Sequence, residues 1–328
     1  MTKTFAQAIP APRTWLGADQ ANRSDWVLPL GREQIEELGR AADSFRRSGL
    51  QLDAARPADF DLPALEPLVR DIRYELRHGR GFVLVRGLNV GDYTLEELEL
   101  IFWGIGVYLG VGVSQSAAGD RLGHVIDRGS TDRYYTAGGR IEFHMDPVDV
   151  VGLMCVRPAK EGGLSRIASS STIHNILLEE RPDILDILYR GFYCSRQGHG
   201  ETVTDWRVPV FAVGTDGLES YLLPITIRQA AAEGASLGDA EREAIRVLQE
   251  VAGSDRVCLN MDFRPGDIQF LNNRLIFHSR SDYKDHADPA FRRLLLRLWL
   301  MMPDWPGRHS AMDLHKRTDR AGGGVQAG

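Results

Sequence analysis

Cysteine is scarce in this chain of 328 residues, and its few positions exclude two kinds of site. The three cysteines, Cys155, Cys194 and Cys258, are odd in number, widely spaced and set among apolar residues. No pair has the Cys-x-x-Cys spacing of thiolate zinc sites, and an odd count does not fit a disulfide framework. We therefore expect no disulfide scaffold and no zinc–thiolate site, as in a reducing cytoplasm.

The chain also lacks a long apolar run and an excess of positive charge. No stretch approaches the roughly 18 apolar residues of a membrane-spanning helix. The first residues, MTKTFAQAIPAPRTW, contain no apolar core of a secretion signal. The formal net charge is −6, whereas nucleic acids and anionic membranes select basic surfaces. We therefore expect neither nucleic acid nor a membrane as a partner. The sequence predicts a cytoplasmic protein, and it is compatible with a homo-oligomer.

Hydrophobic periodicity predicts helices separated by short strands. The capping pair Thr94 and Glu97 marks the start of one helix. The expected helices cover residues 32–48, 64–78, 94–110, 171–189 and 238–252. The expected strands cover residues 81–87, 148–156, 164–169, 207–213, 256–263, 267–273, 274–279 and 291–301. Residues 264–267, Arg-Pro-Gly-Asp, predict a turn between two of the strands.

This order of elements favours a mainly β fold with inserted helices, an α+β protein with a jelly-roll core flanked by helices. We expect one domain over residues 1–309, beginning with an irregular arm over about 1–30 that is rich in proline and alanine. Residues 310–328 end in a glycine-rich stretch and predict a frayed tail.

Three histidine–acid pairs with one residue between them are candidates for a metal site: His144/Asp146, His199/Glu201 and His286/Asp288. The second pair lies in a glycine-flanked loop and the third in a polar segment that ends at Pro289. Only His144 and Asp146 stand beside a strongly apolar strand, where residues two apart share a face. Both side chains could therefore reach one ion.

His278 closes the run NRLIFH and is the best second histidine. Two imidazoles and one carboxylate on one face of an octahedral ion leave three positions open, as in non-haem iron(II) oxygenases. Taken alone, His144 and His278 could equally be ordinary polar residues at strand ends that bind no metal.

Two arginines add a stronger signal. Alternation along residues 291–301 places four leucines, 294, 296, 298 and 300, on one face. Arg293, Arg297 and Trp299 fall on the other face together with Leu295. A buried arginine requires an anion, and its planar fork suits a carboxylate. The alternative is a sheet surface that faces solvent.

Together these residues resemble the taurine dioxygenase (TauD/TfdA-like) family of iron(II)/2-oxoglutarate oxygenases. The matching segments, in the family's order, are FHMD (143–146), PAKEGGLS (158–165), PGDI (265–268), NRLIFH (273–278), and Arg292-Arg293 followed by Arg297. The resemblance implies a double-stranded β-helix, with iron(II), 2-oxoglutarate and O₂ as cofactors.

By that resemblance His144, Asp146 and His278 are the iron ligands. Arg293 would pair with the distal carboxylate of 2-oxoglutarate, with Arg297 close by. Ser165 stands where relatives often carry a threonine whose hydroxyl shares this carboxylate. Family members that halogenate lack the acidic ligand, so the resemblance implies hydroxylation of a C–H bond, with desaturation or ring formation as related outcomes.

The substrate is less well defined by the sequence. Arg140 stands where relatives place a substrate contact, and it favours an anionic or amino-acid-like small molecule. Gln115, His124 and Arg228 are further polar candidates. The polar segment 114–139 leads into His144 and predicts a cover over the metal. A non-catalytic metal-binding jelly roll and a zinc hydrolase are the alternatives left open.

Overall fold

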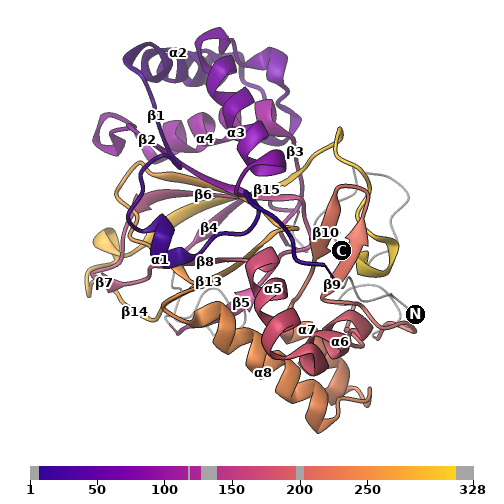
Figure 1. Cartoon of the computed structure of the whole chain (residues 1–328). Helices are drawn as coiled ribbons and strands as arrows, with labels where there is room; N and C mark the ends of the chain where they lie inside the picture. Colours follow the sequence, from indigo (N-terminus) through magenta and orange to yellow (C-terminus); the bar gives the residue numbers. More distant parts are fainter. Residues whose placement is uncertain (1–6, 117–118, 127–138, 197–202, 315–328) are drawn as a thin grey trace.

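The computed structural model describes residues 7–116, 119–126, 139–196 and 203–314 (Figure 1). The helices are α1 (Gly17–Gln20), α2 (Arg32–Ser48), α3 (Glu66–His78), α4 (Leu95–Leu109), α5 (Ser170–Glu180), α6 (Pro182–Arg190), α7 (Pro224–Ala232) and α8 (Asp239–Gly253). The strands are β1 (Val27–Pro29), β2 (Phe82–Arg86), β3 (Val111–Gly112), β4 (Leu122–Val125), β5 (Ile141–His144), β6 (Val150–Arg157), β7 (Glu161–Gly162), β8 (Ser165–Ser169), β9 (Phe211–Gly214), β10 (Gly217–Ser220), β11 (Leu259–Met261), β12 (Ile268–Asn272), β13 (Ile276–Arg280), β14 (Tyr283–Lys284) and β15 (Leu294–Met301).

Two sheets form the centre of the fold. The larger has the strand order β1-β2-β12-β6-β15-β3, and β4 also pairs with β15. The smaller has the order β11-β8-β13-β5 and is antiparallel throughout. Helices α2, α3 and α4 lie above the larger sheet, whereas α5 to α8 lie below the smaller one (Figure 1). This arrangement confirms the predicted jelly-roll core flanked by helices.

Three apolar cores follow from these layers. Leucines of β15 pack with α2, α3 and α4 on the outer face of the larger sheet. A second core joins α5, α6 and α8 to Phe143 and Phe277 of the smaller sheet. A third lies between the two sheets and includes Cys155, Ile167 and Leu295. The space between the sheets is therefore mostly filled by apolar side chains, and any polar group there needs a reason.

Several local predictions are confirmed. Helix α2 covers the predicted residues 32–48. At the start of α4, Glu97 N–H donates to Thr94 Oγ1, and Thr94 N–H donates to Glu97 Oε2, as expected of a capping box. The predicted turn precedes β12, where Gly266 has a φ of 88°. A side chain there would also collide with the carbonyl oxygen of Leu88.

The predicted single helical stretch over 171–189 is wrong in one respect. Helices α5 and α6 are separate, and Arg181 between them has φ −144° and ψ 62°. Pro182 causes the break, because a residue that precedes proline is disfavoured in the helical region.

The two ends of the chain are more ordered than expected. In the arm predicted to be irregular, β1 pairs in parallel with β2, and Trp15 is buried against Phe82. In the predicted tail, Met312 and Leu314 are buried in the second core. The fold therefore continues to residue 314, and the rest of the tail lies outside the described residues.

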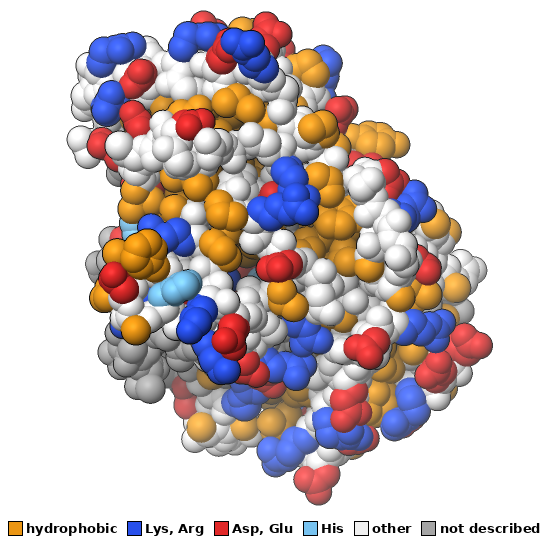
Figure 2. Space-filling view, turned by 90° about the vertical axis from the view of Figure 1, so that its left-hand side faces the viewer, with side chains coloured by type: hydrophobic (Ala, Val, Ile, Leu, Met, Phe, Trp, Pro, Cys, Tyr) orange, Lys and Arg blue, Asp and Glu red, His pale blue; other side chains and the backbone are white. Residues whose placement is uncertain are grey.

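Charged side chains of both signs lie on the described surface (Figure 2). In the face shown in Figure 2, acidic and basic side chains are interspersed among apolar ones. Within the described ranges, no helix is long and apolar enough to cross a membrane.

Candidate metal centre

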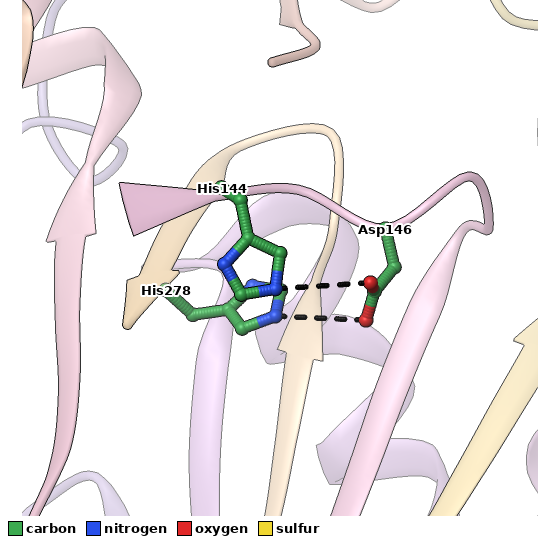
Figure 3. Close-up of side chains that lie close together, drawn as sticks. All are labelled: His144, Asp146 and His278. Atoms are coloured by element: carbon green, nitrogen blue, oxygen red, sulfur yellow. Dashed lines mark ion pairs between the residues drawn. The ribbon is translucent and has the colours of Figure 1, made fainter. Parts of the chain in front are cut away.

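His144, Asp146 and His278 come together between the two sheets (Figure 3). His144 ends β5 and stands directly opposite His278 of β13, with ring centroids 4.2 Å apart. Asp146 follows β5, with Oδ1 3.8 Å from His144 Nε2 and Oδ2 3.6 Å from His278 Nε2. One donor atom from each residue lies within 4.8 Å of the others. No other such group of metal-binding side chains occurs in the part of the chain that the structure describes.

Hydrogen bonds with the backbone hold the His144 ring and the main chain at Asp146 in place. His144 Nδ1 lies 2.9 Å from the carbonyl oxygen of Glu142. A carbonyl can only accept, so this nitrogen carries the proton and the lone pair lies on Nε2. Met145 donates its N–H to Leu222 and points into the second core. The carbonyl oxygen of Asp146 accepts from the Asn273 side chain and from the N–H of Val148.

The protonation states suit a cation. Burial, followed by the neighbouring His278, lowers the pKa of His144 to about 4. For Asp146, burial is the largest influence and raises the pKa, but the hydrogen bond from His278 and nearby positive charges outweigh it. The pKa of Asp146 is therefore below its usual range. A neutral imidazole and an ionised carboxylate are the forms that bind a metal ion.

The donor set fits a divalent iron ion. Two imidazole nitrogens and one carboxylate on the same side of a buried space are the ligands of non-haem iron(II) oxygenases. The Nδ1 atom of His278 has no hydrogen-bond partner among the described residues.

Arg293 lies just before β15 and is buried. Its guanidinium carbon lies 5.3 Å from the ring centroid of Tyr283, and its Nη1 has no partner among the described residues. Burial, and then the positive charge of Arg280, lowers the pKa of Arg293 to about 10. The guanidinium is thus charged at neutral pH, and no carboxylate of the described residues forms an ion pair with it. Its burial excludes the alternative of a strand face in solvent.

Ser165 lies beside this arginine pocket. It opens β8 and is directly opposite Arg280 of β13, whose guanidinium carbon is 4.6 Å from the same Tyr283 ring. The Ser165 hydroxyl donates to Gln269 Oε1 at 3.1 Å. Arg280 and Tyr283 were missed by the sequence analysis. The position of Arg280 two residues after His278, on the same strand face, was the available signal.

Arg297 is also buried, but it is already anchored. Its Nε donates to Gln115 Oε1 at 2.7 Å. Both N–H groups of the Gln115 amide are used in turn, by the carbonyl oxygens of Arg121 and Arg297. Gln115 was predicted to contact substrate. The structure instead makes it an internal support for Arg297, because no amide N–H remains for another partner.

The other predicted substrate residues contact groups outside the triad. His124 lies on β4, where its Nε2 is 2.7 Å from Glu99 of α4, so it faces the helical layer and not the metal. That prediction is wrong because β4 pairs with β15 and turns His124 outward. Arg140 is exposed and lies against Gly253 at the end of α8. Arg228 forms an exposed ion pair with Glu142, two residues before His144.

Of the two competing pairs, only His286 and Asp288 lie in the described residues, and they form no metal-binding group there. Asp288 caps a short 3-10 helix through the N–H of Ala290, and His286 lies beside Phe291. His199 and Glu201 lie outside the described residues. The predicted cover over 114–139 is only partly described, because 117–118 and 127–138 are not. Its described part contains β4, which pairs with β15.

Two further residues contact Asp146. The indole N–H of Trp299 donates to Asp146 Oδ2 at 3.0 Å, and Asn273 donates to its backbone carbonyl. Strand alternation had placed Trp299 on the same face as Arg297. The partner of its N–H could not be known, since Asp146 comes from a distant part of the chain.

Comparisons with known proteins agree with this geometry. The chain is 30% identical over 333 residues to the taurine hydroxylase-like protein SAT17 of Stachybotrys chartarum, covering 91% of this chain and 82% of that protein. It is 27% identical over 330 residues to FR-33289 synthase of Streptomyces rubellomurinus, covering 96% and 97%.

Solved structures show the same fold. An asparagine oxygenase complex with Fe(II), 3-hydroxyasparagine and succinate has a TM-score of 0.68 at 16% identity, covering 84% of this chain and 94% of that one. The non-haem iron oxygenase OrfP with Fe and alpha-ketoglutaric acid has a TM-score of 0.61 at 14% identity, covering 84% and 93%. These ligands agree with the cofactors expected from the sequence. A family model, described as taurine catabolism dioxygenase TauD, TfdA family, matches residues 44–299, and the chain belongs to that family.

Proposed function

We propose that this protein is an iron(II)- and 2-oxoglutarate-dependent dioxygenase that hydroxylates an unactivated C–H bond of a small molecule. His144, Asp146 and His278 hold the iron in this proposal. The observation that carries it is the buried triad, whose donor atoms lie within 4.8 Å of one another. Family membership and the cofactors of solved relatives support it.

The bound iron and 2-oxoglutarate supply the oxidative chemistry, in which 2-oxoglutarate is converted to succinate and CO₂. The chain's own residues prepare the site. The hydrogen bond from His144 Nδ1 to Glu142 aims Nε2 at the ion. Apolar residues such as Leu295 and Val151 line the inner face of the larger sheet and exclude water.

The co-substrate is held through its distal carboxylate in this proposal. Arg293 is charged and buried, and its Nη1 has no partner among the described residues. A carboxylate would satisfy this nitrogen and offset the charge. The hydroxyl of Ser165 and the guanidinium of Arg280 lie at the same pocket. Arg297, which is stacked over Trp299 and anchored by Gln115, contributes positive charge nearer the metal.

The substrate proposed is a small anionic or amino-acid-like compound. One solved relative is named an asparagine oxygenase, and OrfP was solved with L-Arg. The ion pair of Arg228 and Glu142 lies on the β5 side of the triad and offers both charges that a zwitterion needs. Arg140 stays a predicted contact. Asp146 supplies the acidic ligand, which favours hydroxylation over halogenation.

Anaerobic addition of iron(II) and 2-oxoglutarate tests the function. We expect a weak visible metal-to-ligand charge-transfer band, which needs the iron and the chelating 2-oxo acid together. A non-catalytic metal-binding jelly roll or a zinc hydrolase would not give this band. Screening amino acids and sulfonates for stimulated succinate formation then identifies the substrate. Failure of the band to form would contradict the proposal.

A further inference from the structure

Trp299 of β15 forms a buried hydrogen bond with the carboxylate of Asp146. The indole Nε1 donates to Asp146 Oδ2 at 3.0 Å, and the two residues are only 6% and 7% exposed. Apolar side chains, among them Val113, Val148 and Val151, also pack against Trp299. A buried hydrogen bond to a carboxylate is strong and directional, so it restricts how the carboxylate can turn.

The indole itself is held in place. The guanidinium carbon of Arg297 lies 4.8 Å from the centre of the Trp299 ring. Gln115 fixes that guanidinium through a 2.7 Å hydrogen bond to its Nε. The ring is therefore packed between apolar side chains and an anchored arginine, and its N–H direction is defined before any ligand binds.

The number of open metal positions depends on how Asp146 binds. Two imidazoles and one carboxylate oxygen occupy three of the six positions of an octahedral ion. If the second carboxylate oxygen of Asp146 also bound the ion, only two positions would stay open. A chelating 2-oxo acid would fill both, and no position would remain for O₂. Oδ2 lies 3.6 Å from His278 Nε2 and is near enough to reach the same ion if it were free to turn.

We propose that Trp299 is a positioning residue that keeps Asp146 Oδ2 off the metal, so that the carboxylate binds through Oδ1 alone. The indole then preserves the position that O₂ requires after 2-oxoglutarate has bound. This inference rests on the proposed function, because it takes His144, Asp146 and His278 as the iron ligands.

Nitric oxide titration of the anaerobic iron(II)–2-oxoglutarate complex, followed by electron paramagnetic resonance, tests the inference. We expect Trp299→Phe still to form the visible band but to bind nitric oxide roughly ten- to a hundredfold more weakly, as is typical when an outer partner of a metal ligand is lost. The matched control is Trp103→Phe. Trp103 is a buried tryptophan of α4 whose Nε1 has no partner among the described residues, and this variant should bind nitric oxide like the wild type.

A second substitution separates the hydrogen bond from the shape of the ring. Benzothienylalanine at position 299 replaces the indole N–H with sulfur and retains its size, so it should reproduce the Trp299→Phe result without a cavity. Wild-type nitric oxide affinity in both variants, or an equal loss in Trp103→Phe, would overturn the inference. Absence of the visible band from the wild-type protein would instead overturn the proposed function.

Discussion

The two faces of β15 are built for different purposes. The outer face carries four leucines that pack with α2, α3 and α4, and no polar group interrupts it. The inner face carries Leu295, Arg297 and Trp299, and each of the latter two has a specific polar partner. The outer face of β15 thus stabilises the fold through apolar packing. The inner face orients side chains of the metal centre through hydrogen bonds. Substitutions on the two faces should have separable effects.

The largest expected effect comes from the triad. Replacing His144, Asp146 or His278 with Ala should abolish succinate formation from 2-oxoglutarate, because each removes one of three iron ligands. Circular dichroism should show that the fold is retained, since the apolar cores are untouched. Wild-type succinate production by any one variant, with other metal ions removed, would show that its residue is not a ligand.

The outer face should affect stability without affecting the metal. Leu298→Ala should lower the free energy of unfolding by about 2–5 kcal/mol, because Leu298 is fully buried against the close approach of Gly106. Urea denaturation measures this, and iron binding at low temperature should be unchanged. The matched control is Leu95→Ala on the exposed part of α4, which should change stability by less than about 0.5 kcal/mol. Loss of iron affinity in folded Leu298→Ala would show that the faces are coupled.

Arg293 should separate co-substrate binding from metal binding. Arg293→Met should weaken 2-oxoglutarate binding by about ten- to a hundredfold, the equivalent of about 1.5–3 kcal/mol for a lost charge-assisted contact. Ser165→Ala should have a smaller effect in the same direction. Calorimetry with the manganese-loaded protein measures both.

Two controls accompany Arg293→Met, a variant of the neighbouring arginine and an analogue of 2-oxoglutarate. Arg292→Met removes the neighbouring, half-buried arginine and should leave the affinity unchanged. The analogue 2-oxopentanoate lacks the distal carboxylate, so wild-type protein and Arg293→Met should bind it alike. Equal weakening for 2-oxopentanoate and 2-oxoglutarate would move the carboxylate contact away from Arg293.

The smallest effect concerns pH. Because burial lowers the pKa of His144 to about 4, the folded metal-free protein keeps this ring neutral where the unfolded chain protonates it, below about pH 6.5. Unfolding therefore takes up a proton, and the free energy of unfolding should fall as the pH falls from 6.5 towards 4. The contribution of this ring is at most about 1.4 kcal/mol per pH unit. Urea denaturation at pH 5 and 6 should show that the free energy of unfolding depends less steeply on pH in His144→Ala than in the wild type. An identical pH dependence in the two proteins would contradict the lowered pKa of His144.

Local signals made much of the fold predictable. Helix α2 was predicted at about residues 32–48, because its apolar positions recur at helical spacing. The inner and outer faces of β15 followed from strict alternation. The break at Pro182 was a local signal that the apparent period across α5 and α6 concealed.

Features set by distant partners were not predictable. β4 has only four residues and no sustained alternation, and it becomes a strand because Leu295 to Leu298 of β15 offer it backbone partners. The direction of His124 followed from that pairing. In the same way, His144 and Asp146 could be selected from the sequence. The hydrogen bonds from Trp299 to Asp146 and from Gln115 to Arg297 could not, because these residues are distant in sequence and meet only in the folded chain.

The direct opposition of His144 and His278 across β5 and β13 has a consequence for the lifetime of the protein. An ion held by both rings is a reversible cross-link between two strands that are remote in sequence. Since the unfolded chain lacks this pair of ligands in place, free iron stabilises the folded form by mass action, by about 2.7 kcal/mol at a hundred times the dissociation constant. Resistance to proteolysis should therefore rise and fall with the iron supply, so that iron starvation would lower the amount of the enzyme as well as its activity.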